Sequence, residues 1–165
     1  MRLARFPAFL AGLVAVASFA WVPAGFTQQP DATGAPEAVF VGSEACASCH
    51  DTQYQTFSKY SKKAHSSKSV QIMASDLTEE ELRGCYGCHT TGYGKPGGFE
   101  SFSATPALAN AGCEVCHGPG SAHAESGGDA SLIKGKLTMA DCESCHSAER
   151  VAAFNFKPML YAGAH

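Results

Sequence analysis

Four copies of one short motif constrain this chain more than any other feature of its sequence. All eight cysteines among the 165 residues are arranged in pairs, each pair has two residues between its members, and a histidine directly follows each pair. The cysteines are Cys46, Cys49, Cys85, Cys88, Cys113, Cys116, Cys142 and Cys145, and the histidines that follow them are His50, His89, His117 and His146. This C-x-x-C-H pattern is the signature for covalent attachment of c-type haem.

The spacing within the motif has a chemical reason. Two intervening residues let both thiols reach the two vinyl groups on one edge of a porphyrin, and the adjacent histidine then lies under the ring as the proximal iron ligand. We therefore predict four covalently bound haem c groups, each held by one cysteine pair with the following histidine on the iron.

Two other interpretations of paired cysteines explain less of the pattern. Zinc can be held by two C-x-x-C pairs, but zinc would not require a histidine after each pair. Disulfide-bonded pairs of thiol oxidoreductases usually occur once, beside a βαβ pattern that this sequence lacks. Neither interpretation accounts for four histidines in register with four cysteine pairs.

The first residues predict export. Residues 1–26 contain Arg2 and Arg5, then an apolar run over 8–22 and small residues, which is typical of a secretory signal peptide. The apolar run is short for the roughly 20 residues of a membrane span, and no second one follows. We expect no integral membrane segment in the mature chain and a periplasmic or extracellular location.

The rest of the chain divides into a linker and one domain. Residues 27–38 are rich in Pro, Gly, Gln and Ala and predict a flexible linker, which leaves 39–165 as a tetrahaem cytochrome c domain. The formal net charge is -3 and becomes -5 without Arg2 and Arg5. This negative charge argues against nucleic acid as a partner.

Helix signals lie beside the motifs. Tyr54, Phe57 and Tyr60 are three residues apart and predict a helix over 51–63. Thr78, with a glutamate three residues later, predicts a capping box leading towards the second motif, and Thr138 is a candidate N-cap before the fourth.

Glycine-rich segments predict loops at 91–99 and 118–128, and no strand pattern of alternating residues is present. Because the domain has few aliphatic runs, the haems themselves must fill its interior. We predict a mainly α fold with extensive loops, in which short helices and loops wrap four closely packed haems. The aromatic residues expected to pack against haem are Phe57, Tyr86, Tyr93, Phe99, Phe102, Phe154, Phe156 and Tyr161.

Three histidines outside the motifs, His65, His123 and His165, are expected to bind the far side of the irons. Four irons then have three distal histidines. The sixth ligand of the remaining iron could be a methionine, a residue of another subunit, or absent. The candidate methionines are Met73, Met139 and Met159, of which Met159 has the most aromatic surroundings.

Chain geometry restricts which distal histidine serves which haem. The first predicted helix would place His65 about 20 Å from His50, so His65 must serve another haem. His123 follows His117 by six residues, a short connection around a porphyrin edge, and should also serve a neighbour. His165 has enough chain before it to fold back over the fourth haem.

The motifs and their surroundings resemble the tetrahaem cytochrome c family of the cytochrome c554 (c-prime) type. The resemblance covers roughly residues 40–165. The residues that carry it are Cys46 to His65, the second motif with Gly92-Tyr93-Gly94 and Gly97-Gly98-Phe99 after it, and Gly112 to Gly120 around the third motif.

This resemblance implies a set of ligands. His65 would bind the third haem, His123 the first and His165 the fourth, while the second haem would be five-coordinate. It also implies haems stacked in nearly parallel and perpendicular pairs, electron shuttling, and nitric oxide chemistry proposed for the open iron. The segment between His146 and His165 is much shorter than in that family, so the part that would shield the second haem has no clear counterpart.

The predicted function is electron transfer between redox protein donors and acceptors. Bis-histidine ligation should give the haems low potentials. One alternative is an enzyme that reduces a nitrogen oxide or peroxide at a five-coordinate second haem. Another is a homo-oligomer, in which the chain forms a protomer of a haem-lined extracellular filament.

Overall fold

The computed structural model describes residues 37–147. The predicted signal peptide, His165 and Met159 lie outside the described residues, as do Phe154, Phe156 and Tyr161. Within the described part the chain forms short helices and 3-10 turns joined by loops, with no strand, which confirms the predicted fold class. The elements are α1 (Ser43–Cys46), α2 (Asp51–Tyr60), η1 (Lys62–His65), α3 (Ser67–Met73), η2 (Ala74–Asp76), α4 (Glu79–His89), η3 (Pro106–Leu108), α5 (Cys113–His117), α6 (Ser121–Glu125), η4 (Ala130–Leu132) and α7 (Met139–Glu143).

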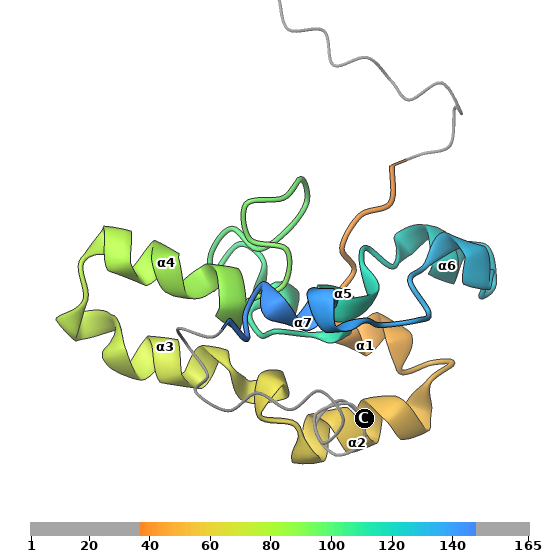
Figure 1. The fold of residues 1–165 in the computed structure, drawn as a ribbon, viewed down its shortest axis with the longest axis horizontal. Helices are drawn as coiled ribbons and strands as arrows, with labels where there is room; N and C mark the ends of the chain where they lie inside the picture. Colours follow the sequence, from red (N-terminus) through yellow and green to blue (C-terminus); the bar gives the residue numbers. More distant parts are fainter. Residues whose placement is uncertain (1–36, 148–165) are drawn as a thin grey trace, which may run out of the picture. The chain divides into compact units, whose positions relative to one another are not determined.

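The helices that carry the motifs gather near one another. Helices α2 and α3 follow each other along one side, and α4 turns back to pack against α3 (Figure 1). Helix α1 contacts α2, α5 and η3. The first and third motifs are thereby brought together, although 67 positions of sequence numbering separate Cys46 from Cys113.

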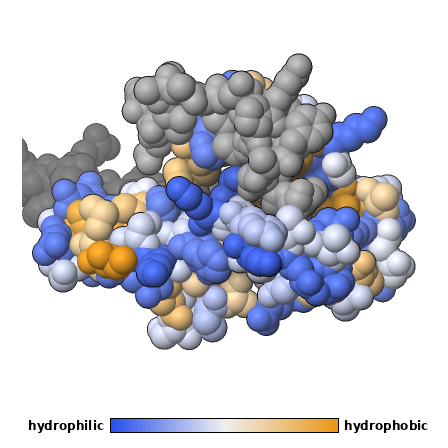
Figure 2. Space-filling view, turned by 90° about the horizontal axis from the view of Figure 1, so that it is seen from below, coloured by the Kyte–Doolittle hydropathy of each residue, from blue (hydrophilic) through white to orange (hydrophobic). Residues whose placement is uncertain are grey.

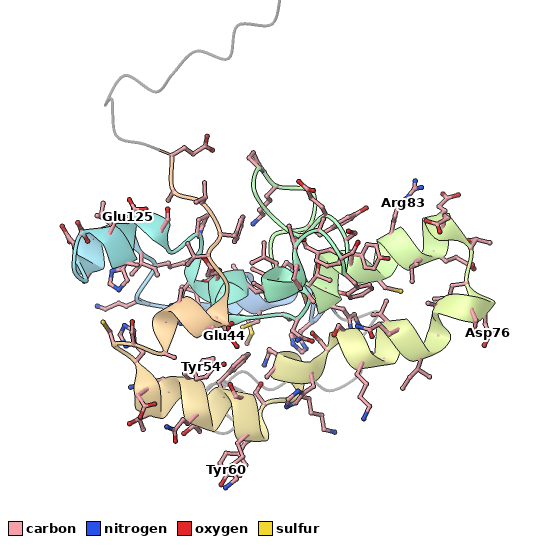
Figure 3. All side chains as sticks on the ribbon, turned by 180° about the vertical axis from the view of Figure 1, so that it is seen from behind. Glu44, Tyr54, Tyr60, Asp76, Arg83 and Glu125 are labelled. Atoms are coloured by element: carbon pink, nitrogen blue, oxygen red, sulfur yellow. The ribbon has the colours of Figure 1, made fainter. Side chains whose placement is uncertain are left out.

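Helix α2 is shorter than predicted. It ends at Tyr60, and the backbone of Ser61 is extended while its side chain accepts a hydrogen bond from the Lys63 amide. Residues three apart drift around a helix of 3.6 residues per turn, so the aromatic stripe does not stay on one face. Phe57 is 8% exposed and Tyr60 is 66% exposed, and Tyr60 points away from the inward-directed Tyr54 (Figure 3).

Both predicted helix starts are confirmed. The Thr78 amide donates to the Glu81 carboxylate at 2.9 Å, and the Glu81 amide donates back to the Thr78 hydroxyl at 3.3 Å. Thr138 occupies the same position before α7. These reciprocal bonds satisfy amides that a helix start otherwise leaves without partners.

One of the two predicted glycine loops is wrong. Residues 91–99 are irregular, as expected, but α6 (Ser121–Glu125) forms inside the predicted loop 118–128. The flanking glycines suggested a loop, whereas the five residues of α6 contain no glycine or proline and include two alanines, which favour helix. This short helix carries His123.

The hydrophobic core is small. Among the described residues, the buried hydrophobic side chains are Phe57, Val70, Phe99, Leu108 and Ala111. Viewed from the side on which α2 and α3 lie, the surface is largely hydrophilic, with hydrophobic residues in separate patches (Figure 2). Within residues 37–147, no helix is both long and apolar enough to span a bilayer.

Backbone and hydroxyl hydrogen bonds hold the glycine-rich loop after α4. The Thr91 amide donates to the Leu108 carbonyl at 2.9 Å, and its hydroxyl donates to the Asn110 carbonyl at 2.6 Å. The Phe99 amide donates a hydrogen bond to the Thr91 carbonyl at 2.9 Å. This closure brings the backbone of Gly98 against that of Gly92, where a Cβ on Gly98 would overlap the Gly92 carbonyl.

Replacing Gly98 with alanine should therefore destabilise the protein by about 1–3 kcal/mol, because the crowded backbone must move. Urea unfolding followed by circular dichroism of the haem-loaded protein measures this loss. Gly84→Ala is the matched control, since Gly84 is exposed on α4 with open space around its Cβ position. Equal unfolding midpoints for Gly98→Ala and the unmodified protein would contradict the crowding argument.

Candidate functional site

Each motif forms about one turn of helix. The His50 amide donates to the Cys46 carbonyl and the His146 amide to the Cys142 carbonyl, both at 2.8 Å, while the second and third motifs lie within α4 and α5. Residues three and four positions apart share one face of a helical turn. The two thiols and the imidazole of each motif therefore project from the same side.

The eight cysteines all lie in the described part of the chain, and none of them forms a disulfide bond there. None is more than partly buried, since Cys49 is exposed and the others are half-buried. The thiols are thus available for thioether bonds, as the predicted attachment chemistry requires.

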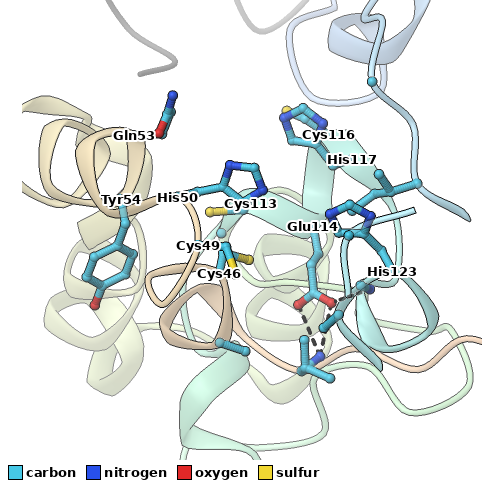
Figure 4. A pocket seen from close by; sticks show the side chains of 18 of the residues that line it. Cys46, Cys49, His50, Gln53, Tyr54, Cys113, Glu114, Cys116, His117 and His123 are labelled. Atoms are coloured by element: carbon cyan, nitrogen blue, oxygen red, sulfur yellow. Dashed lines mark hydrogen bonds between the residues drawn. The ribbon is translucent and has the colours of Figure 1, made fainter. Parts of the chain in front are cut away.

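One cavity joins the first and third motifs (Figure 4). Its volume is about 600 Å³, within the range of roughly 300–1,000 Å³ that small-molecule and cofactor sites occupy. Apolar wall residues are Val41, Phe57, Ile133 and Leu137, and the chemically active lining residues are Cys46, Cys49, His50, Cys113, Cys116, His117 and His123. Apolar walls with convergent thiols and imidazoles suit a covalently held porphyrin.

Two histidine rings lie near each other in this cavity. The rings of His50 and His123 are nearly parallel, with an interplanar angle of 21° and centroids 6.2 Å apart. Two imidazoles on opposite sides of one metal ion have nitrogens about 4 Å apart, which places ring centres about 6 Å apart. The separation of His50 and His123 therefore fits a pair of axial ligands to one iron.

Three histidines are oriented by backbone carbonyls. The Nδ1 atom of His123 donates to the Asp129 carbonyl at 2.9 Å, that of His117 to the Lys134 carbonyl at 2.7 Å, and that of His89 to the Ser66 carbonyl at 3.0 Å. Because a carbonyl only accepts, each ring carries its proton on Nδ1. The Nε2 lone pair is then left for a metal, as is common for metal-binding histidines.

The motifs lie next to one another in a definite order. The Cys46 thiol interacts with Cys113, which joins the first motif to the third. Cys116 lies close enough to Cys142 for their charges to interact, which joins the third to the fourth. The Cys145 thiol lies 4.0 Å from the Gly87 carbonyl, so the fourth motif adjoins the second.

The environment shifts the ionisation of several groups in the motifs. The Cys46 thiol, with a smaller contribution from the Ser43 hydroxyl, lowers the pKa of Cys113 to about 6, although burial opposes this effect. Burial, assisted by the charge of Lys63, lowers the pKa of His146. A lower pKa favours the neutral imidazole, which is the form that binds iron.

Aromatic rings surround the second motif. Tyr86, between its two cysteines, makes edge-to-face contacts with Tyr93, Phe99 and Phe102 at centroid distances of 5.3, 5.2 and 5.8 Å. Burial raises the pKa of the Tyr86 hydroxyl. These rings form an apolar wall where the sequence predicted packing against haem, and that role stays a prediction.

Not every predicted ligand reaches the cavity. His65 is exposed, and its Nε2 donates to the Ser58 carbonyl at 2.8 Å, which leaves Nδ1 as the nitrogen available for a metal. Met73 and Met139 are 54% and 42% exposed. The ligand roles of His65, Met73 and Met139 stay predictions.

Sequence reasoning missed two residues near the motifs. Glu114 is buried, lines the cavity and accepts backbone hydrogen bonds. Ser66 donates to the His89 carbonyl at 2.7 Å and accepts from the Ala111 amide at 2.8 Å. Glu114 was missed because nothing in the sequence indicates that a glutamate inside a haem motif is buried. Ser66 was missed because it belongs to no recognisable motif.

Comparison with known proteins shows which family and which fold this chain is similar to. Residues 45–118 match the model of the family described as cytochrome c554 and c-prime. The chain is 35% identical to cytochrome c-554 of Nitrosomonas europaea over 121 residues, which cover 66% of this chain and 48% of that protein. The chain thus spans about half the length of that curated relative.

A solved structure shares the fold. The reduced state of cytochrome c554 from Nitrosomonas europaea superposes with a TM-score of 0.57 at 23% identity, covering 79% of this chain and 86% of that chain. This likeness shows that the two chains share a fold of short helices and loops.

The fourth motif lies outside residues 45–118, the segment that the family model matches. Local charges hold its helix. The amide and hydroxyl of Thr138 donate to the Asp141 carboxylate at 2.8 and 2.9 Å, and the Lys134 ammonium forms a salt bridge with the same group. The bond from Lys134, followed by those from Thr138, lowers the pKa of Asp141 to about 2 from its usual 3.8.

Stability should therefore depend on Asp141 in a pH-dependent way. Because its folded-state pKa is depressed, the carboxylate stabilises the fold above about pH 4, and this contribution is lost as the pH falls towards about 2. Asp141→Asn should unfold at lower urea concentration than the unmodified protein at neutral pH, with a difference that narrows below about pH 4. Asp76→Asn, at an exposed residue, is the control. If Asp141→Asn and the unmodified protein differed in urea stability by the same amount at every pH, the charge of Asp141 would not be the cause.

Proposed function

Since residues 45–118 belong to the cytochrome c554 and c-prime family, we propose that this chain is an exported electron carrier. In this proposal it binds four covalent haem c groups and exchanges electrons with redox proteins in the periplasm or outside the cell. Covalent haem c follows from membership of a cytochrome c family, and occupation of all four motifs is part of the proposal. Similarity to cytochromes favours electron transfer over the reductase and filament alternatives.

The observation that carries the proposal is the pairing of His50 with His123 across the cavity. Haem iron, when bound, supplies a reversible one-electron change between its ferric and ferrous states. Two imidazoles at both axial positions leave no position for a substrate, which suits electron transfer. The centroid separation and the nearly parallel planes of the two rings support His123 as the distal ligand of the first haem, the pairing that the family resemblance implies.

The order of the motifs supports a continuous path. Contacts and charge interactions join the first motif to the third, the third to the fourth and the fourth to the second. No motif stands apart from the others. Attachment sites packed in this order would hold their four cofactors close together, as an electron carrier needs.

Backbone hydrogen bonds keep the ligands in place. The His117 ring donates to the Lys134 carbonyl, and the Lys134 amide donates back to the His117 carbonyl at 3.1 Å. His89 is similarly held by Ser66. Fixed imidazoles reduce the rearrangement that accompanies a change of charge on a bound metal, which favours rapid transfer.

The haem content tests the proposal directly. Mass spectrometry of the purified, denatured protein should give the mass of the processed polypeptide plus four haems, because thioether bonds survive denaturation. The double variant Cys85→Ser and Cys88→Ser should weigh about one haem less. A mass equal to the polypeptide alone would contradict covalent haem attachment altogether.

His123→Ala tests the ligand pairing. Loss of a sixth ligand should convert the first haem to a five-coordinate iron, which adds a high-spin ferric signal to the electron paramagnetic resonance spectrum. Gln53→Ala, which changes another residue lining the same cavity, should retain the spectrum of the unmodified protein. An unchanged spectrum in His123→Ala would remove His123 as a ligand.

A further inference from the structure

Glu114 is a buried acid at the centre of the proposed redox site. It lies inside the third motif, lines the cavity shared with the first motif, and is 3% exposed. Among the described residues that line the cavity, the other charged one is Lys63, which is only half-buried. A charge removed from water is screened far less than one at the surface, so Glu114 should dominate the fixed field in the cavity.

Backbone amides hold the Glu114 side chain as an anion. The Gly42 amide donates to Oε2 at 2.8 Å, the Gly120 amide donates to Oε1 at 2.8 Å, and the Val41 amide donates to both oxygens at 3.0 and 3.2 Å. Each partner is an N–H donor, which an ionised carboxylate accepts and a carboxylic acid proton would oppose. These bonds also fasten residues 41–42, just before the first motif, to the third motif (Figure 4).

The fourth motif offers a natural comparison. Glu143 follows Cys142 as Glu114 follows Cys113, so the two acids occupy the same position within their motifs. Glu143 is exposed to solvent, whereas Glu114 is buried. The charge of Glu114 is therefore screened by water much less than the charge of Glu143, although both acids occupy the same motif position.

We propose that Glu114 sets the redox potential of the haems held at the first and third motifs, while positioning those two motifs against each other. This inference rests on the proposed electron-transfer function and deepens it. A fixed negative charge stabilises the more positive ferric iron relative to ferrous iron. Glu114 thus makes this cavity the low-potential, electron-donating part of the protein.

A potentiometric titration of the haem-loaded protein, followed by electron paramagnetic resonance, tests the proposal. Glu114→Gln should shift at least one haem transition to a more positive potential, and the signal altered in His123→Ala identifies the haem of the first motif. Glu143→Gln should leave every transition in place. A Glu114→Gln protein that titrates like the unmodified protein would overturn the proposal.

Glu114→Asp separates charge from structure. Aspartate keeps the negative charge but shortens the side chain, so the transitions should stay close to those of the unmodified protein even if the variant unfolds more easily. A shift in Glu114→Asp as large as that in Glu114→Gln would show that the effect comes from disturbed packing, and this would also overturn the proposal.

Infrared spectroscopy gives a second measurement if Glu114→Gln yields no loaded protein. In the redox difference spectrum of protein with ¹³C-labelled glutamate, an ionised carboxylate band should respond to haem reduction and persist in Glu143→Gln. Absence of any glutamate band would count against the inference. Absence of haem from the unmodified protein would instead contradict the proposed function, so the two failures are distinguishable.

Discussion

The whole structure depends on one geometric fact about the helical turn. A cysteine, a second cysteine three residues later and a histidine one residue further share a face, so a single turn can hold a porphyrin edge and its iron. Residues 37–147 repeat this turn four times but bury only five hydrophobic side chains. We infer that the cofactors take the place of an ordinary core, which explains why the helices are short and why the motifs, rather than apolar stripes, bring them together.

Hydrogen bonds of polar groups connect the segments of this fold, a role that apolar side-chain packing has in other small domains. Ser66 is the clearest case: its hydroxyl joins the His89 carbonyl to the Ala111 amide, and its carbonyl orients the His89 ring. One residue at the start of α3 therefore connects the second motif to the segment that precedes the third. No buried polar side-chain atom in the described part lacks a hydrogen-bond partner, as expected where such bonds replace apolar contacts.

The sequence was a good guide wherever a residue's role is local. Cysteine spacing, the capping residues Thr78 and Thr138 and the glycine loop after α4 depend on near neighbours, and the structure contains the expected helices and loop. It was a poor guide where distant contacts decide. The burial of Glu114 depends on the amides of Val41 and Gly42, which are far from it in the sequence, and residue patterns do not encode such contacts. The end of α2 at Tyr60 and the helix that carries His123 have local causes that the aromatic spacing and the flanking glycines concealed.

Glu114 and Glu143 show why a motif alone cannot specify the charge around a cofactor. After the third motif, Gly118 adopts a φ of 81°, in the region that favours glycine, and the chain reverses so that the Gly120 amide reaches the Glu114 carboxylate. The fourth motif is followed by Ser147 and Ala148, which lack that conformational freedom. Gly118 therefore helps to place one of the amides that enclose Glu114, and the Val41 and Gly42 amides supply the others. Four motifs of nearly identical sequence can in this way hold chemically identical cofactors in different electrostatic environments, and a gradient of potential requires such differences.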